Sequence, residues 1–242
     1  MDLLALVNRL ALECAVSGAP YATVVGATGE QARLVTWIQQ GYADLQNEVP
    51  LWQFLRSSTF LTGGAGTGVS FATVSGQAVY PLGTGAGTVG VTAANFGSWV
   101  PYSFRDQTTS VGVQDQIFLD WVSYDVWRDS YSYGAQQTVT TRPVAIAVGP
   151  NNSICVGPWP NASYTITGDY YRSPVSMSAD ADEPSNIPAQ FQIAIVYRAM
   201  RFYGMYEAAS DVIVRGDLGY RQTLRQLATL RAPMVTAGRT LA

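Results

Sequence analysis

The sequence contains no histidine and no lysine, so all fourteen basic residues are arginine. Without histidine there is no Ser-His-Asp or Cys-His catalytic centre, no histidine-ligated zinc and no imidazole that titrates near neutral pH. Without lysine there is no Walker-type phosphate loop and no Schiff-base lysine. The two cysteines, Cys14 and Cys155, are too few and too far apart for a disulfide framework or a metal knuckle. The composition therefore leaves catalysis by carboxylates, or no catalysis at all.

Long uncharged hydrophobic runs are also absent. Asp2, Arg9 and Glu13 interrupt the apolar start, so we expect no signal peptide, and no run approaches the ~20 residues of a membrane span. We therefore expect no membrane partner and reduced cysteines, as in a protein assembled in a cytoplasm. The 242 residues are 48% hydrophobic and 13% charged, which favours one or two compact domains over a disordered chain.

Residues 1–56 have the apolar spacing of two helices. The first runs over about residues 3–14 behind Asp2, a candidate N-cap. Thr28 and Gln31 fit a capping box for the second, which Pro50 ends. Each helix has one apolar stripe, and an isolated amphipathic helix of this length is marginally stable in water. Both helices therefore need packing partners.

Residues 57–186 have the composition of an antiparallel β domain, with Gly, Thr, Ser, Val and aromatic residues in short runs between turns. Alternation over residues 142–148, a turn at 149–152 and a return at 154–156 predict a hairpin. We expect further strands over residues 91–100 and 163–171, and a short helix capped by Ser123. Aromatic side chains of such a domain lie in its core more often than they line a ligand groove. We therefore expect a core position for six of them: Trp99, Trp121, Trp127, Trp159, Tyr170 and Tyr171.

Residues 187–242 return to helix. Pro188 fits a first helical position, and apolar residues recur from Phe191 to Tyr206 at steps of three or four. A second helix follows, closed by Pro233, in which Gly216 and Gly219 favour a kink or a split. The expected fold class is α+β: residues 1–56 and 187–242 form one discontinuous helical module, and residues 57–186 form an inserted antiparallel β domain of sandwich or barrel type.

Three motifs suggest chemistry but have simpler explanations. Residues 85–90 match the dinucleotide pattern G-x-G-x-x-G, yet no βαβ unit surrounds them, so flexible turns with residues 63–68 are favoured. An acidic cluster at Asp180, Asp182 and Glu183 lacks the rest of a calcium loop and suits a linker before a helix. No carboxylate stands out as a raised-pKa acid for a glycosidase among Asp115, Asp120, Asp125 and Asp129. We predict no catalytic residue, no cofactor and no metal.

Charge follows the same three segments. Residues 1–56 have three arginines and five acidic residues, residues 57–186 four and nine, and residues 187–242 seven and three, so the net charges are −2, −5 and +4. Such asymmetry suggests that the two ends meet different partners, although solvated helix faces often carry uneven charge. Apart from Arg198 and Arg201, the C-terminal arginines are our candidate interface residues toward a protein partner or nucleic acid: Arg215, Arg221, Arg225, Arg231 and Arg239.

The order of several short motifs resembles the head-to-tail adaptor (connector, neck) proteins of tailed bacteriophages. In the N-terminal segment these are Thr28 to Gln31, Trp37, Leu45-Gln46 and residues 52–56, and after the β region they are residues 168–172, Asp182-Glu183-Pro184, residues 195–197, Tyr203 and residues 206–208. The resemblance covers both helical ends and the last strand, but little of residues 57–165.

The resemblance implies a structural virion protein of the neck, assembled in the host cytoplasm. Proteins of this family form rings, usually of twelve copies, beneath the portal protein and extend the DNA channel toward the tail. By this analogy the C-terminal helix and the residues after it dock on the portal, the β domain faces outward or toward tail or nozzle proteins, and channel DNA is contacted without sequence specificity. The alternative is a β module that binds a host surface or polysaccharide on a helical base, and a carboxylate-dependent hydrolase ranks third.

Overall fold

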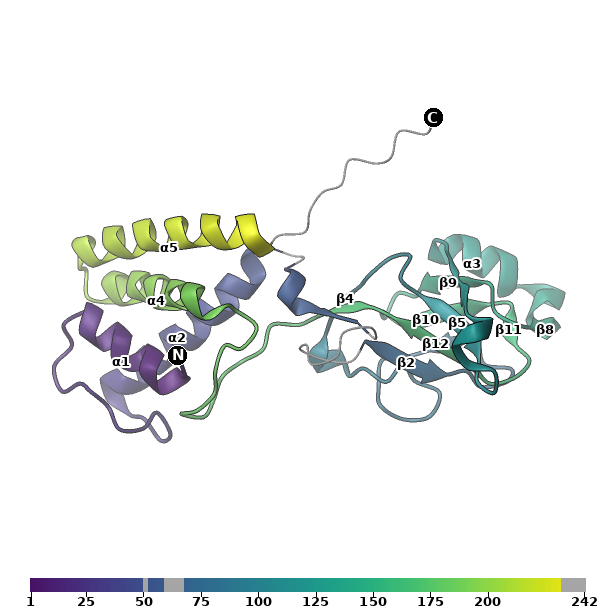
Figure 1. The fold of residues 1–242 in the computed structure, drawn as a ribbon, viewed down its shortest axis with the longest axis horizontal. Coiled ribbons are helices and arrows are strands. Elements are labelled where there is room, and N and C mark those ends of the chain that lie inside the picture. The colour runs from purple at the N-terminus through teal and green to yellow at the C-terminus, as the bar shows by residue number, and fades with distance from the viewer. Residues whose placement is uncertain (50–51, 59–67, 232–242) are drawn as a thin grey trace, which may run out of the picture. The chain divides into compact units, whose positions relative to one another are not determined.

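The computed structural model describes residues 1–49, 52–58 and 68–231, which form five α-helices and thirteen short strands, an α+β fold as predicted (Figure 1). The chain divides into two compact units. One unit combines Met1–Phe54 with Pro174–Ala242, and the other is Leu55–Ser173. No helix among the described residues is both long enough and apolar enough to cross a membrane.

Four helices build the first unit: α1 (Leu3–Glu13), α2 (Gly29–Glu48), α4 (Ile193–Tyr206) and α5 (Ser210–Arg231). Asp2 caps α1 as predicted, because its carboxylate accepts a hydrogen bond from the Ala5 amide at 2.7 Å. The predicted capping box of α2 is wrong. Thr28 makes no side-chain cap bond, and the Gln31 amide instead donates to the Thr23 carbonyl at 2.5 Å.

The start of α4 also differs from the prediction. Pro188 precedes a single 3₁₀ turn, Ala189–Phe191, and the α-helix begins only at Ile193. Helix α4 contacts α1, α2 and α5, and lies between α5 on one side and α1 and α2 on the other (Figure 1). Its fully buried residues include Ile195, Val196, Ala199 and Met200. The apolar stripes of the two chain ends therefore meet on α4.

Glycines allow these helices to approach one another closely. A Cβ on Gly41 of α2 would lie 2.9 Å from the Ile195 carbonyl oxygen, and one on Gly216 of α5 would lie 2.8 Å from the Tyr197 carbonyl oxygen. Helix α5 runs without a break from Ser210 to Arg231. The predicted split at Gly216 and Gly219 is wrong, because backbone contact with α4 stabilises a helix that glycine alone would weaken.

Residues 174–186 make their contacts within the helical unit, although the composition grouped them with the β domain. The Gln46 side chain both donates to the Val175 carbonyl and accepts from the Val175 amide, each at 2.9 Å. Met177 is buried. The amide of Leu3, in the first turn of α1, donates to the Asp182 carbonyl at 2.8 Å. This extended segment therefore satisfies backbone groups at the exposed end of a helix.

The described residues of the second unit form four small sheets and one α-helix, α3 (Tyr124–Tyr131). The strand orders are β1-β13-β4, β3-β10-β9-β7, β11-β8 and β2-β12-β5-β6. The strands are β1 (Arg56–Ser57), β2 (Val69–Ala72), β3 (Val79–Tyr80), β4 (Phe96–Trp99), β5 (Arg105–Thr108), β6 (Ile117–Phe118), β7 (Asp120–Trp121), β8 (Thr140–Thr141), β9 (Ala145–Val148), β10 (Ile154–Gly157), β11 (Trp159–Pro160), β12 (Tyr164–Gly168) and β13 (Tyr170–Arg172).

The predicted hairpin is confirmed, because β9 and β10 pair antiparallel with Val148 opposite Ile154. The strand predicted over residues 163–171 is divided between β12 and β13, which lie in different sheets. Only β4 forms within residues 91–100, after a 3₁₀ turn at Ala93–Asn95. The pairs β7-β9 and β8-β11 are parallel, which the prediction of a purely antiparallel domain missed.

The aromatic residues of this unit are mainly core, as expected. Trp99 and Tyr170 are buried in one cluster that draws on three of the four sheets, Trp127 is buried in a second, and Trp121 and Trp159 pack against these clusters. Ser123 caps α3 by accepting from the Val126 amide at 3.4 Å. The glycine motif at residues 85–90 lies in a turn closed by a Gly83–Val91 bridge, and only a 3₁₀ turn and strand β4 follow it, with no α-helix at its end. Pro50, Gly63, Gly64, Gly66 and Pro233 lie outside the described residues.

We predict that the helical unit folds without the β unit. Residues 1–54 joined to 174–242 by a short Gly-Ser linker should give a soluble helical protein, because the stripes that meet on α4 lie within these residues. Circular dichroism and thermal unfolding would test this.

The matched control joins residues 1–56 to 187–242 and so removes residues 174–186. It should melt at a lower temperature, because the buried side chain of Met177 and the hydrogen bonds to Gln46 and Leu3 are lost. A β-rich or unfolded spectrum for the longer protein would contradict the discontinuous module.

Candidate interface on the C-terminal helices

Two C-terminal arginines hold the helical unit together. The Arg198 Nε donates to the Asp44 carboxylate at 2.7 Å, and its guanidinium lies 5.4 Å from the Tyr220 ring centre. Arg198 thereby joins α4 to both α2 and α5. Arg201 lies 3.6 Å from the Asp217 carboxylate, which adds a weaker contact between α4 and α5.

Arg215, one of the predicted interface residues, also has an internal contact. Its Nη2 donates to the Glu13 carbonyl at 2.6 Å, at the C-terminal end of α1. Helix α1 has no basic residue in its own last turn, so Arg215 supplies the positive charge that favours this end of the helix. We therefore assign Arg215 to the internal structure as well as to the surface.

Arg221 and Arg225 differ from the other arginines. Both are exposed and lie one turn apart on α5, off the face that buries Tyr220 and Leu227, as predicted. Among the arginines whose side chains the structure describes, those at positions up to 215 each have a hydrogen-bond, ion-pair or ring partner, whereas Arg221 and Arg225 have none among the described residues. Their guanidinium groups are thus free to bind a carboxylate or phosphate bidentately.

Gln222, Gln226 and Leu218 lie beside these two arginines and line a shallow hollow with them. The surface therefore combines cationic groups and amides with one exposed aliphatic side chain. Arg231 is the last residue of α5, and Arg239 lies outside the described residues. Of the five predicted interface residues, the structure thus places Arg221 and Arg225 together on one exposed face.

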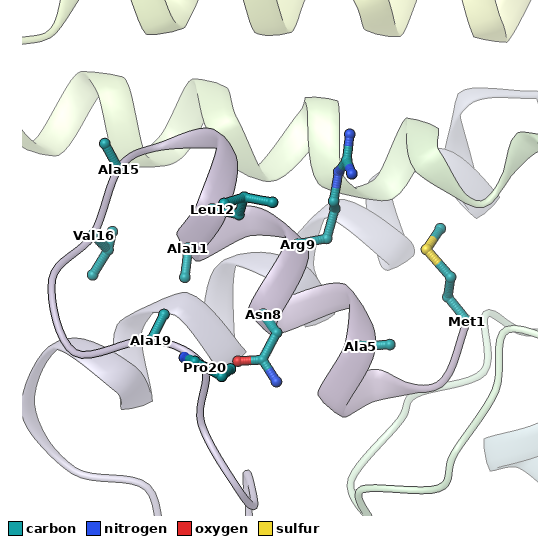
Figure 2. Close-up of a pocket in the computed structure, with 10 residues that line it drawn as sticks. All are labelled: Met1, Ala5, Asn8, Arg9, Ala11, Leu12, Ala15, Val16, Ala19 and Pro20. Atoms are coloured by element: carbon teal, nitrogen blue, oxygen red, sulfur yellow. The ribbon is translucent and has the colours of Figure 1, made fainter.

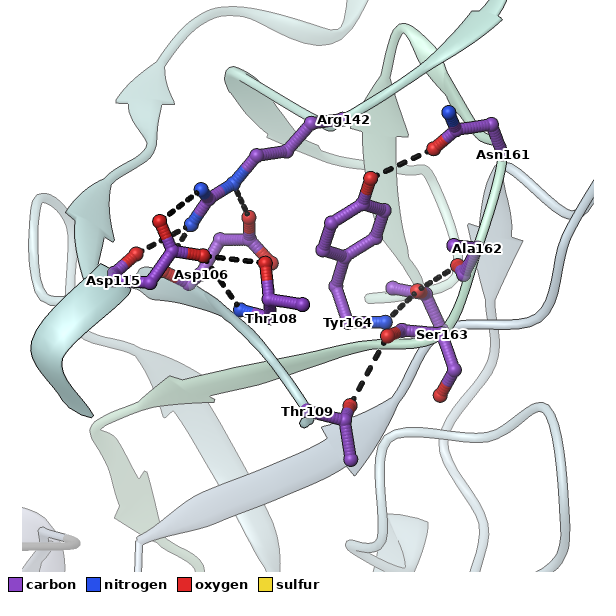
Figure 3. A network of polar contacts seen from close by, with 10 residues as sticks. Asp106, Thr108, Thr109, Asp115, Arg142, Asn161, Ala162, Ser163 and Tyr164 are labelled. Atoms are coloured by element: carbon purple, nitrogen blue, oxygen red, sulfur yellow. Dashed lines mark hydrogen bonds and ion pairs between the residues drawn. The ribbon is translucent and has the colours of Figure 1, made fainter. Parts of the chain in front are cut away.

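The second unit contains a charge cluster that sequence reasoning missed (Figure 3). The Arg142 Nε donates to the Asp106 carboxylate at 2.7 Å, and its Nη1 donates to the Asp115 carboxylate at 2.8 Å. Asp106 is completely buried. Burial raises the pKa of Asp106, against the opposing effect of Arg142, whereas hydrogen bonds from Thr108 and Arg142 lower the pKa of Asp115.

This cluster serves structure rather than a substrate, because Asp106 has no exposed surface for a substrate to reach. Arg142 joins β5, the 3₁₀ turn Gly112–Asp115 and the segment before β9. No sequence signal marks Asp106, because its burial results from contacts between segments distant in the chain.

Four of the other acidic residues considered in the sequence have structural partners. Arg128 pairs with Asp125 and Asp129, and Asp120 is an exposed strand residue. Asp180 accepts from the Thr23 hydroxyl and the Val24 amide, which lowers its pKa. Asp182 accepts from the amides of residues 178 and 179, which lowers its pKa as well. Within the described ranges, no three His, Cys, Asp or Glu residues gather as a metal site.

Comparison with known proteins gives one family match. A family model described as SU10 adaptor protein matches residues 1–239, which is nearly the whole chain. A comparison with curated proteins gives no match.

We predict that Arg142→Met destabilises the second unit by about 3–5 kcal/mol at neutral pH, because the buried Asp106 loses its cation. Without that cation the pKa of Asp106 rises further above its unfolded value. Stability from such a group is lost as pH rises through the folded pKa, so the deficit should shrink from pH 7 to pH 5. Urea unfolding followed by tryptophan fluorescence would measure both effects.

The control is the double variant Asp106→Asn with Arg142→Met, which removes the buried charge. It should recover part of the loss and show no such pH dependence. A single variant with the same deficit at both pH values would show that Asp106 is not the group responsible.

Proposed function

Because the chain belongs to the SU10 adaptor protein family, a bacteriophage head-to-tail adaptor family, we propose that it forms a ring in the virion neck that docks on the portal protein and extends the DNA channel to the tail. The family makes it a structural component of the virion and suggests that it is not an enzyme. In this proposal the partners are the portal, further copies of the chain, and tail or nozzle proteins.

The observation that carries portal docking is the pair of free guanidinium groups on α5. Arg221 and Arg225 have no partner within the described residues, while nearby arginines on the same two helices are paired inside the unit. A helical unit that leaves two adjacent arginines unpaired can place both in an interface without losing an internal contact. The contact surface in this proposal is the outer face of α5, together with Arg231, Arg239 and the rest of residues 232–242.

The partner groups are acidic side chains of the portal in this proposal, with DNA phosphate as a second candidate. Arginine pairs bidentately with either group. Phosphate contacts weaken steeply with salt and carry no sequence preference, whereas carboxylate pairs within a partly buried interface are screened less. Salt dependence therefore distinguishes the two.

The alternative function, a β module that binds a host surface or polysaccharide, finds less support. The aromatic residues that would line a sugar groove are mostly core: Trp99, Trp127 and Tyr170 are buried. We place the β unit toward tail or nozzle proteins on the family analogy alone.

We predict that Arg221→Glu with Arg225→Glu leaves the subunit folded but reduces portal binding at least 100-fold. Two charge reversals replace attraction by repulsion, and removal of one partner from a buried charge pair costs several kcal/mol. Binding to purified portal rings at two salt concentrations, and incorporation into virions, would measure the effect.

The matched control is Arg33→Glu with Arg128→Glu, which changes the net charge equally but alters α2 and α3 rather than α5, at arginines with internal partners. It should bind portal within a few-fold of the unchanged protein. If the α5 variant bound portal as tightly as the unchanged protein, the outer face of α5 would be a solvated surface and not the portal contact. Failure of the unchanged protein to bind portal would overturn the docking proposal.

A further inference from the structure

Two pockets of the molecule differ in the chemistry of their linings. In the helical unit, a groove of about 540 Å³ lies beside α1 and the loop that follows it, and its lining is mainly apolar, with Asn8 and Arg9 at its margin (Figure 2). In the second unit, a pocket of about 340 Å³ is lined by Arg56, Arg105 and Asp169. An apolar lining accepts many occupants, whereas charged groups define the ligand that they bind, so the second pocket identifies its ligand more closely.

Arg56 is fixed at this pocket by Asp169. Its Nε and Nη2 both donate to one Asp169 carboxylate oxygen, at 3.1 and 2.6 Å. The Ser103 hydroxyl accepts from the Asp169 amide at 3.1 Å and donates to the Val100 carbonyl at 2.7 Å, which holds the backbone of Asp169 in place. Among the described residues, the third guanidinium nitrogen of Arg56, Nη1, has no hydrogen-bond partner, and the side chain is 42% exposed. Arg56 can therefore donate to an anion without losing Asp169.

Two exposed aromatic side chains stand at the same pocket. Tyr102 is 73% exposed and Phe118 is 66% exposed. The Arg105 guanidinium lies 4.6 Å from the centre of the Phe118 ring. The Tyr102 ring lies 6.5 Å from that of Trp121, which packs against the core. Cationic groups and exposed rings thus meet at one pocket, a combination that is enriched in protein interfaces.

The backbone of Tyr102 is in the left-handed region, with a φ of 60°. Tyr102 follows Pro101 in a turn, at a position where glycine is favoured because it has no Cβ. A bulky exposed residue in this conformation lowers stability, and residues of this kind gather at functional sites. The chain therefore has a tyrosine where glycine would be more stable, which points to a role for the ring.

Charge favours a protein carboxylate over nucleic acid as the ligand. The second unit, residues 55–173, contains five arginines and six acidic residues, a net charge of −1. The pocket holds two of the arginines and one of the acidic residues, so the rest of the unit has a net charge of −2. A single carboxylate matches a small positive pocket, whereas a DNA strand carries phosphates along its length and would meet the surrounding negative charge.

We infer that this pocket binds an acidic side chain of a protein partner. Arg56 and Arg105 donate to its carboxylate, and Tyr102 and Phe118 contact the apolar residues beside it. The inference rests on the proposed function, in which the β unit faces tail or nozzle proteins, and it assigns that contact to named residues. The partner segment is therefore an acidic residue next to apolar ones.

Short peptides test the pocket in the full-length protein. The probe is the tripeptide Leu-Asp-Phe with both ends blocked, and its matched control is Leu-Asn-Phe, which has nearly the same shape without the charge. Leu-Asp-Phe should bind about tenfold more tightly, because hydrogen bonds to a charged acceptor are stronger than those to a neutral one. Isothermal titration calorimetry would measure both affinities. The NMR signals of the arginine Nε–H groups should shift for Arg56 and Arg105.

The variant Tyr102→Gly separates binding from folding. It should weaken Leu-Asp-Phe binding about fivefold, because the ring contact is lost, and should leave the melting temperature unchanged or higher, because glycine suits the left-handed backbone. The matched control is Ala208→Gly, which makes the same kind of change at a φ of 53° in the helical unit and should bind the peptide like the unchanged protein. Arg105→Gln should remove most of the difference between the two peptides.

Three results would overturn the inference. Equal affinity for the two peptides would mean that the pocket does not bind a carboxylate. Inorganic phosphate that binds as tightly as Leu-Asp-Phe would mean a simple anion site. Undiminished peptide binding by Tyr102→Gly would mean that the peptide binds elsewhere. No portal takes part in these assays, so their failure leaves the test of portal docking untouched, and Tyr102→Gly should bind portal rings like the unchanged protein.

Discussion

The close contact of α4 with three other helices is the constraint on which the helical unit depends. Helix α4 comes late in the chain, yet its small and aliphatic residues fill the centre of a unit that begins at residue 1. Gly41 and Gly216 let the neighbouring backbones approach its carbonyl oxygens without a Cβ in the way. Any side chain at these positions would separate the helices and open the core, because protein interiors tolerate little change of volume. The insertion of about 120 residues between α2 and α4 therefore leaves one continuous core.

The arginines divide into those that serve this unit and those that remain available. Arg198, Arg201 and Arg215 join helices to one another, by a carboxylate, a weaker ion pair and a backbone carbonyl. Only after these partners are assigned do Arg221 and Arg225 stand out. In a chain without lysine or histidine, every cationic side chain is a planar guanidinium group, which suits partly buried pairs better than an ammonium does. Of the seven arginines in residues 187–242, this division leaves Arg221 and Arg225 as one candidate surface on α5.

The β unit differs from the helical unit, because its sheets are small and its strands are short. Among the described residues, fourteen buried side chains form its main cluster, and Arg142 joins β5 to the 3₁₀ turn Gly112–Asp115 through Asp106 and Asp115. Asp106 is stable in this position only because Arg142 accompanies it, since an isolated buried carboxylate costs several kcal/mol. The ion pairs join a strand to a turn, and the apolar cluster buries the larger area. The glycine-rich turns that resemble a nucleotide motif connect strands here.

The sequence by itself determined the α+β class, the helical ends, the β9-β10 hairpin and the caps at Asp2 and Ser123, because these follow from periodicity and from hydrogen bonds between residues a few positions apart. The order of short motifs also pointed to the adaptor family. Tertiary structure alone decided that residues 174–186 contact the helices, that the strand over residues 163–171 divides between two sheets, and that α5 stays continuous through its glycines. It also decided which arginines are free. Each of these depends on contacts between segments far apart in the chain, and local spacing carries no information about them.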